Sequence, residues 1–514
     1  MSTVLERFRP LFEPRGIVVA GVSTHAGKFG FVAAHNILSL GYRGELFLVH
    51  REGAEVLGRK TLRSVEEVPY GAADLVFVCT PPETVPELLR ACARRGIRAA
   101  FVASGGYGET GAEGKRAEQE LAALAKELGL LLAGPNGQGI VSTPVSLCAQ
   151  IVAPYPPRGH IAVASQSGGF VQAFSNYARS TGVGLSRAIS AGNCAALSLE
   201  DYLEYFAEDP ETRAVFVYLE GLRDGRAFFE RARSVTRRKP FVVLRGGVTE
   251  GGQRAAASHT GALASDERIF EGLCRQAGIS RVRTVAEGFY TCAAFATLPL
   301  PEGPRVFVLT TAGGWGVLAA DRVSSSSVLR LLPLPSDLRA AFDSRLPPRW
   351  SRNNPADLAG SETRDTVPEC LELVAAHPEV DAVLFLGLGI QSNLGELERE
   401  SPFYPGYGLE RVVAYHERQD RRYARTAVEL SRRYGKPVLV STELAETRPG
   451  NPGVEEMRSL RTVAFPSVER ALTALEHMVR YSRYLSRRGL ARPGTENPAA
   501  QERAQSTPNR SRAR

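Results

Sequence analysis

Long apolar runs and paired cysteines are missing from this chain of 514 residues. No stretch of 18 or more apolar residues occurs, so the sequence predicts no membrane-spanning helix. The first residues lack the apolar core of a secretion signal. The seven cysteines are scattered and never stand in C-x-x-C spacing, which argues against a zinc site or a disulfide framework. We therefore expect a cytoplasmic protein with reduced thiols, no metal site and no membrane contact.

Lysine is also scarce, with six among the 63 basic residues. A formal net charge of +8 raises the possibility of a nucleic-acid partner. Much of the excess lies after residue 483, where polar residues and proline replace apolar ones, and such tails are usually solvated. No zinc finger, helix-turn-helix or aromatic–basic interleaving is visible. We expect no nucleic-acid partner and a disordered basic tail at 486–514.

Short apolar strands alternate with helical patterns along the rest of the chain. The predicted strands are 16–21, 46–49, 75–79, 99–103, 160–164, 184–190, 214–219, 240–244, 305–310, 382–387 and 437–440. This alternation is typical of α/β folds with doubly wound parallel sheets. Proline-rich stretches at 154–157 and 299–304 suggest linkers. We predict domains at 1–145, 146–300 and 301–485, with a polar insertion near 392–427 in the third.

A histidine among small residues is the most informative position. His259 stands in Ala-Ala-Ala-Ser-His-Thr-Gly-Ala, after the glycine pairs at 246–247 and 251–252 and before a predicted helix at 262–276. Glycine pairs let a loop move, and a neutral imidazole is a competent nucleophile near neutral pH. The pattern therefore suits a histidine that takes and carries a phosphoryl group. The alternative is an exposed loop histidine without chemistry.

A second element upstream strengthens the first interpretation. An apolar strand runs into Ser165-Gln-Ser-Gly-Gly169 and then into an amphipathic helix. Ser165, Ser167, Gly168 and Gly169 would present hydroxyls and free backbone N–H groups at a helix N-terminus, which favours a bound anion. We predict a phosphate site there, although a capped strand-to-helix turn is the ordinary alternative.

The first strand leads into Gly21-Val-Ser-Thr-His-Ala-Gly-Lys-Phe-Gly30, which lacks the G-x-G-x-x-G spacing of a standard dinucleotide site. No acidic residue follows the second strand to hold a ribose; His50 and Arg51 stand there instead. These positive groups and Lys28 favour a ligand with an extra phosphate, such as coenzyme A or a phosphorylated dinucleotide. A generic glycine turn is the alternative.

Together these segments resemble the α subunit of the NDP-forming acyl-CoA synthetases, relatives of succinyl-CoA synthetase α, from about residue 10 to 480. The matching motifs are Gly21–Gly30, Cys79-Thr-Pro-Pro-Glu, Ser104-Gly-Gly-Tyr-Gly, Gly134-Pro-Asn, Ser165-Gln-Ser-Gly-Gly, Ser190-Ala-Gly-Asn, Tyr218-Leu-Glu-Gly, Ser258-His-Thr-Gly-Ala-Leu, Thr310-Thr-Ala-Gly-Gly and Asn353-Asn-Pro-Ala-Asp. The resemblance implies a Rossmann-like CoA-binding domain followed by two flavodoxin-like domains, the third as in the acetate-type enzymes.

The resemblance also implies roles. The expected CoA-binding residues are Gly21, Ser23, Lys28, Gly30, His50, Arg51, Thr80, Pro81, Ser104, Gly105 and Asn136. In this family an acyl phosphate forms from acyl-CoA and phosphate, or the reverse. His259 would carry the phosphoryl group to ADP or GDP, and Glu220 would hydrogen-bond the other imidazole nitrogen.

No stretch looks like an ATP-grasp domain, so a separate ATP-grasp β subunit is expected to hold Mg²⁺ and the nucleotide, in an αβ or α2β2 assembly with a small carboxylic acid as substrate. Four positions depart from the family pattern: Gly137-Gln138 stand where Cys-Leu is usual, Cys194 where lysine is usual, and Ser265 where glycine is common. These departures leave the identity of the acyl substrate open, and they put the catalytic activity of the chain in doubt. The alternative to an enzyme is a non-catalytic CoA-binding regulatory or scaffold protein of the same fold.

Overall fold

The computed structural model describes residues 3–152, 154–222, 224–260, 267–358 and 365–492, with side chains left out for 256–260. By contacts the chain forms two compact units. Unit 1 contains residues 1–236, 240–297 and 444–464; unit 2 contains 237–239, 298–443 and 465–514. The predicted tail lies mostly outside the described residues.

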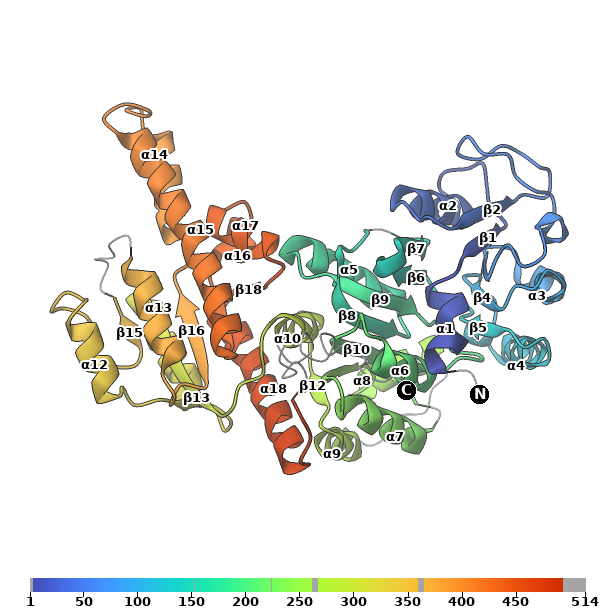
Figure 1. The fold of residues 1–514 in the computed structure, drawn as a ribbon. Coiled ribbons are helices and arrows are strands. Elements are labelled where there is room, and N and C mark those ends of the chain that lie inside the picture. Colours follow the sequence, from blue (N-terminus) through green and yellow to red (C-terminus); the bar gives the residue numbers. More distant parts are fainter. Residues whose placement is uncertain (1–2, 153, 223, 261–266, 359–364, 493–514) are drawn as a thin grey trace, which may run out of the picture. The chain divides into compact units, whose positions relative to one another are not determined.

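The first sheet of unit 1 is fully parallel, with strand order β2-β1-β3-β4-β5 (Figure 1). Its strands are β1 (Gly16–Ala20), β2 (Glu45–Val49), β3 (Leu75–Val78), β4 (Ala99–Val102) and β5 (Leu131–Ala133). Its helices are α1 (Val4–Phe12), α2 (Phe29–Ser39), α3 (Val85–Arg94) and α4 (Ala112–Glu127). β1, β3 and β4 are buried along their whole length, as expected for strands covered on both faces.

The second sheet of unit 1 has the order β12-β11-β10-β8-β9-β6-β7. Its strands are β6 (Gly139–Ser142), β7 (Leu147–Gln150), β8 (Arg158–Ser165), β9 (Leu185–Ser190), β10 (Ala214–Leu219), β11 (Phe241–Arg245) and β12 (Ser280–Val282). The helices are α5 (Gly168–Thr181), α6 (Leu199–Glu208), α7 (Gly225–Thr236), α8 (Glu250–Thr260), α9 (Glu267–Ala277) and α10 (Val285–Thr297). The strands β6 and β7 form an antiparallel edge that the sequence did not predict, and it straddles the predicted boundary at 145/146.

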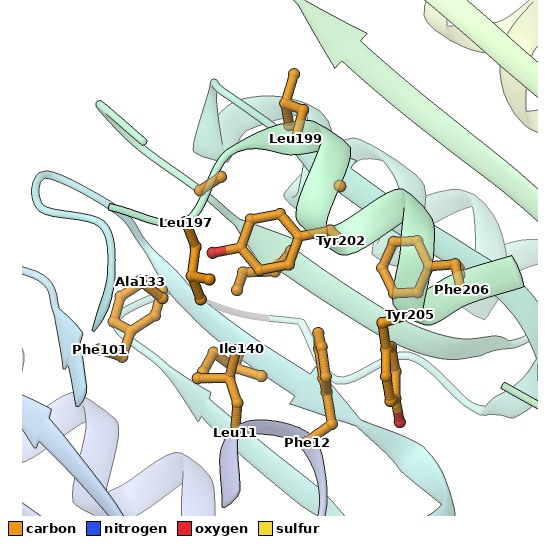
Figure 2. Close-up of a cluster of buried hydrophobic side chains, with 14 of the residues drawn as sticks. Leu11, Phe12, Phe101, Ala133, Ile140, Leu197, Leu199, Tyr202, Tyr205 and Phe206 are labelled. Atoms are coloured by element: carbon orange, nitrogen blue, oxygen red, sulfur yellow. The ribbon is translucent and has the colours of Figure 1, made fainter. Parts of the chain in front are cut away.

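One hydrophobic core runs through both sheets of unit 1. Figure 2 shows Leu11 and Phe12 of α1 lying beside Ile140 of β6 and the aromatic side chains of α6. Phe12 stacks on Tyr205 with ring centroids 4.6 Å apart. Because this core is continuous, the loops at the ends of both sheets are held on one packed body.

The sheet of unit 2 has the order β14-β13-β16-β17-β18, with β15 paired to β13. Its strands are β13 (Arg305–Thr310), β14 (Arg330–Leu331), β15 (Ala356–Asp357), β16 (Ala382–Leu386), β17 (Val438–Ser441) and β18 (Ala464–Phe465). Its helices are α11 (Gly313–Ser324), α12 (Ser336–Asp343), α13 (Thr366–Ala376), α14 (Ile390–Glu400), α15 (Leu409–Tyr434) and α18 (Val468–Arg487). The segment 444–464 carries α16 (Leu444–Thr447) and α17 (Pro452–Ser459) and belongs to unit 1.

The predicted polar insertion at 392–427 lies within a helical hairpin formed by α14 and α15 (Figure 1). None of the helices in the described part of the chain is both long enough and apolar enough to cross a membrane. All seven cysteines are free thiols.

Candidate active site

In the parallel part of each sheet, the strand that opens the α/β winding lies next to a later strand that is not its direct successor in the chain. These neighbours are β1 and β3, β8 and β10, and β13 and β16. Open α/β sheets bind ligands beyond the carboxyl ends of the strands where the winding reverses. The segments Gly21–Gly30 and Ser165–Gly169 follow β1 and β8 at such points.

The turn after β1 requires glycine at both ends. Gly21 has φ +82°, and a Cβ on it would lie 2.8 Å from Cγ2 of Thr80. A Cβ on Gly30 would lie 2.2 Å from the carbonyl oxygen of Gly21. The helix start therefore packs directly on the turn, with Lys28 as the exposed N-cap residue of α2. The Ser23 hydroxyl accepts a hydrogen bond from a backbone N–H two residues on, at 3.0 Å.

His50 and Arg51 follow β2, the strand next to β1. The backbone N–H groups of Gly21 and Val22 donate to the Val49 carbonyl at 3.2 and 3.1 Å, so the two loops leave the sheet side by side. Arg51 is 90% exposed and lies 3.5 Å from the carboxylate of Glu52. The exposed guanidinium is therefore accessible to a phosphate.

The loops after β3, β4 and β5 are joined by hydrogen bonds. The Ser104 hydroxyl donates to the Thr80 carbonyl at 2.5 Å, and the Asn136 N–H donates to the Ser104 carbonyl at 3.0 Å. A Cβ on Gly105 would lie 3.4 Å from Oδ1 of Asn136. Pro81 follows Thr80 and leads toward α3. The structure thus brings these predicted CoA-binding residues to one edge of the first sheet.

Asn193, which follows β9, joins this edge to the second sheet. Its amide donates to Glu109 at 2.6 Å and to the buried Glu118 at 2.8 Å, and Asn136 donates to it at 3.3 Å. Burial acts to raise the pKa of Glu109, but hydrogen bonds from Asn193 and from the backbone lower it on balance. The sequence placed Asn193 in the motif Ser190-Ala-Gly-Asn but did not identify it as a site residue, because its partners Glu109 and Glu118 lie outside every motif.

The predicted phosphate site is a tight turn at the start of α5. The buried Ser165 hydroxyl donates to the Ser167 carbonyl at 2.6 Å and accepts from the Ser167 N–H at 3.1 Å. Ser167 is the N-cap residue of α5, and its side chain makes no capping hydrogen bond. Gly169 is open, because a Cβ on it would have only the Ser167 hydroxyl within 4 Å. The first N–H groups of α5 are therefore available to an anion.

Glu220 follows β10, the neighbour of β8, and is held from both sides. Its backbone N–H donates to the Gln166 amide oxygen at 2.6 Å, and its carboxylate accepts from the Tyr218 hydroxyl at 3.2 Å. Burial and then the Glu220 carboxylate raise the pKa of Tyr218, so this phenol stays a donor. The Phe170 ring stacks on the Tyr218 ring, with their centroids 3.8 Å apart. Gln166 and Tyr218 are thus supporting residues that the sequence contained in its motifs but did not distinguish.

The backbone around His259 differs from the expected loop. Helix α8 covers Glu250–Thr260, so His259 lies in its last turn. The alanines at 255–257 favour helix strongly, which outweighs the preceding glycines. The side chain of His259 and the predicted start of the next helix at 262 lie outside the described residues; α9 is described from Glu267. Among the described residues, no group of three or more His, Cys, Asp or Glu side chains could hold a metal ion.

Three family models match the chain in the order of its sheets. They are a CoA binding domain over residues 15–143, a succinyl-CoA ligase like flavodoxin domain over 158–295, and a ligase-CoA domain over 306–390. The α subunit of ADP-forming acetate–CoA ligase I from Pyrococcus furiosus is 36% identical over 380 residues, covering 73% of this chain and 82% of that one. The α subunit of enzyme II from the same organism is 37% identical over 373 residues, covering 73% and 80%.

The chain belongs to the ADP-forming acetate–CoA ligase α-subunit family. A solved structure supports this: acetyl-coenzyme A synthetase 1 of Ca. Korarchaeum cryptofilum, in complex with phosphate and ADP, has a TM-score of 0.78 and 30% identity, covering 94% of this chain and 99% of that one.

Position 194, where the family pattern suggested lysine, holds a cysteine in this chain. Cys194 is 4% exposed, has φ +54°, and directs its thiol toward the Gly192 carbonyl at 3.7 Å. It is therefore a packed residue of the loop that carries Asn193, rather than an accessible thiol.

Proposed function

We propose that this chain is the CoA-binding, phosphohistidine-carrying α subunit of an NDP-forming acyl-CoA synthetase. Phosphate oxygen attacks the acyl carbonyl carbon, the carbon–sulfur bond breaks, and CoA leaves as the thiol. His259 then takes the phosphoryl group from the acyl phosphate, releasing the carboxylic acid. The phosphohistidine passes the group to ADP or GDP, and every step runs in reverse for synthesis of acyl-CoA.

The observation that carries this proposal is the pairing of Glu220 with the start of α5. Gln166 belongs to the phosphate turn and accepts the backbone N–H of Glu220, so the carboxylate and the N–H groups of the helix start are fixed together. A carboxylate that orients imidazole and an N-terminus that binds phosphate are the two groups that phosphoryl transfer through histidine requires. A non-catalytic CoA-binding protein has no need of this pair.

The nucleotide half of the reaction is assigned to a partner. We propose a separate ATP-grasp β subunit that holds Mg²⁺ with ADP and ATP, or GDP and GTP, in an αβ or α2β2 assembly. The names of the relatives as α subunits support a partner of some kind. A cytoplasmic location stays a prediction.

Phosphorylation of His259 tests the proposal directly. The full chain is mixed with its β subunit, nucleoside triphosphate and Mg²⁺, and intact mass is measured. One phosphate that is acid-labile and base-stable is expected, and it should be lost in His259→Ala. His35→Ala, which removes an exposed histidine on α2, is the matched control and should keep the label. Label that persists in His259→Ala would exclude this histidine.

Ligand preference tests the assignment of CoA binding to the loops of the first sheet. We expect the full chain to bind CoA more tightly than NAD or NADP, because Lys28 and Arg51 offer positive charge near the turn and His50, rather than an acidic residue that would hold a ribose, comes directly after β2. Calorimetric titration of the three ligands measures this. Tight NAD binding without CoA binding would contradict the assignment.

A further inference from the structure

Tyr218 lies at the end of β10, two residues before Glu220, and contacts several elements of the candidate site. Its hydroxyl donates to Oε1 of Glu220 at 3.2 Å. Its ring stacks on the ring of Phe170, the third residue of α5, with the ring planes 20° from parallel. Tyr218 is 9% exposed. The phenol is therefore fixed by its packing, and it bonds the carboxylate from a set position.

The Tyr218 hydroxyl also explains a glycine on the neighbouring strand. Gly246 directly follows β11 and begins the connection to α8, the helix whose last turn contains His259. A Cβ on Gly246 would lie 2.5 Å from the Tyr218 hydroxyl oxygen and 3.3 Å from Cζ of the same ring. The φ angle of Gly246 lies outside the left-handed region, so the backbone conformation does not itself require glycine. The position requires glycine because the phenol fills the space that a side chain would take.

The hydrogen bonds made by Gln166 fix the backbone around Glu220. Its Oε1 accepts from the N–H groups of Glu220 and Gly221 at 2.6 and 3.4 Å, and its amide donates to the Gly221 carbonyl at 3.3 Å. These bonds set the path of the chain after β10, whereas the Tyr218 hydroxyl bonds the carboxylate itself. A glutamate side chain has three rotatable bonds, so a bond to the carboxylate restricts freedom that the backbone bonds leave.

We propose that Tyr218 is a positioning residue for phosphoryl transfer, and that Gly246 leaves the space its hydroxyl needs. This inference rests on the proposed function. A carboxylate that must meet an imidazole nitrogen works best when it is held in one orientation before the reaction. The hydroxyl of Tyr218 holds Glu220 in that orientation, and the stack on Phe170 keeps the phenol in register with the first turn of α5.

Rapid-quench measurement of His259 phosphorylation, in the full chain with its β subunit, tests this. Tyr218→Phe removes one oxygen atom and keeps the ring on Phe170. It should slow phosphorylation by about 10-fold, the low end of the usual scale for a residue that orients another, and leave the affinity for CoA unchanged. Tyr202→Phe is the matched control, because Tyr202 is fully buried in the same unit and its hydroxyl has no partner among the described residues. It should keep the wild-type rate.

A double-mutant cycle separates positioning from packing. In a Glu220→Ala background, Tyr218→Phe should change the rate by less than about 2-fold, because no carboxylate is left to hold. Gly246→Ala should displace the hydroxyl, lower the rate to about that of Tyr218→Phe, and add no further loss when the two are combined.

A wild-type rate in Tyr218→Phe or in Gly246→Ala would overturn the role of Tyr218, as would equal slowing by Tyr218→Phe with and without Glu220. Gly246→Ala keeps the phenol, so it decides the question if Tyr218→Phe does not fold. Absence of phosphate on His259 in the wild-type chain would overturn the proposed function itself.

Discussion

Two helix starts in this chain share one turn and differ in what surrounds it. In unit 1 the Ser165 hydroxyl donates to the Ser167 carbonyl at 2.6 Å and accepts its N–H at 3.1 Å. In unit 2 the Thr310 hydroxyl makes the same two bonds with Ala312, at 2.8 and 2.9 Å. Two glycines then open the helix in each case, at 168–169 in α5 and at 313–314 in α11.

The two helix starts differ in the residues that follow the neighbouring strands β10 and β16. After β10, next to the first turn, Gln166 and Tyr218 hold the carboxylate residue Glu220. After β16, next to the second turn, the chain continues with Gly387 and the buried Leu388. Glu220 thus stands directly after β10, whereas no carboxylate directly follows β16.

The glycine that opens each helix also meets a different neighbour. Gln138 lies against Gly168, and the Asp357 carboxylate lies 2.6 Å from a Cβ placed on Gly313. A carboxylate at a helix N-terminus occupies the place that a phosphate would take, whereas an amide leaves the positive end of the helix free. The strand–turn–Gly–Gly–helix pattern therefore makes a potential anion site, and the neighbouring strands decide its chemistry.

The largest effect should come from the carboxylate that distinguishes the sites. Glu220→Gln is expected to slow phosphorylation of His259 by about 10–100-fold with folding and CoA binding intact, the usual scale for a residue that orients another. Rapid-quench measurement of the phosphorylated chain gives the rate. Asp357→Asn, at the other helix start, should slow the reaction less; equal losses in both variants would remove the distinction drawn between the sites.

Packing at the helix starts provides the next test. Gly168→Ala should lower the free energy of unfolding by about 1–3 kcal/mol, because the methyl group would lie 1.9 Å from Cδ of Gln138. Differential scanning calorimetry of the full chain measures the change. Pairing it with Gln138→Ala should recover part of the loss, since the shorter side chain leaves room. No recovery would show that the strain lies elsewhere.

The smallest effect is expected at the exposed second glycine of the other helix. A Cβ on Gly314 meets nothing within 4 Å, so Gly314→Ala should raise the free energy of unfolding by about 0.4–1 kcal/mol through the reduced entropy of the unfolded chain. Denaturant unfolding gives the value. Gly169→Ala should behave similarly, because its Cβ position is nearly as open. A loss of stability at either position would contradict the open geometry of these helix starts.

The central parallel strands were readable from sequence because each is a short apolar run buried along its whole length, whereas the short strands β5, β12, β14, β15 and β18 were not predicted. The predicted runs at 16–21, 75–79 and 214–219 contain β1, β3 and β10. The edge strands β6 and β7 were missed since their only partners among the described strands are each other and β9, which no local pattern reveals. The hairpin of α14 and α15 was read as a polar insertion because its helices carry many charges and bury few apolar residues.

The α/β class, the family and the segments that carry the chemistry could be read from the amino acids alone, because glycine turns, apolar strands and short motifs are local properties of the chain. Which of those segments meet depends on the folded chain. It brought Gln166 to Glu220, Asn193 to Glu109 and Gln138 to Gly168, pairs that lie far apart in the sequence. Such pairs depend on strand order and on close packing between sheets, and these are set when the whole core forms.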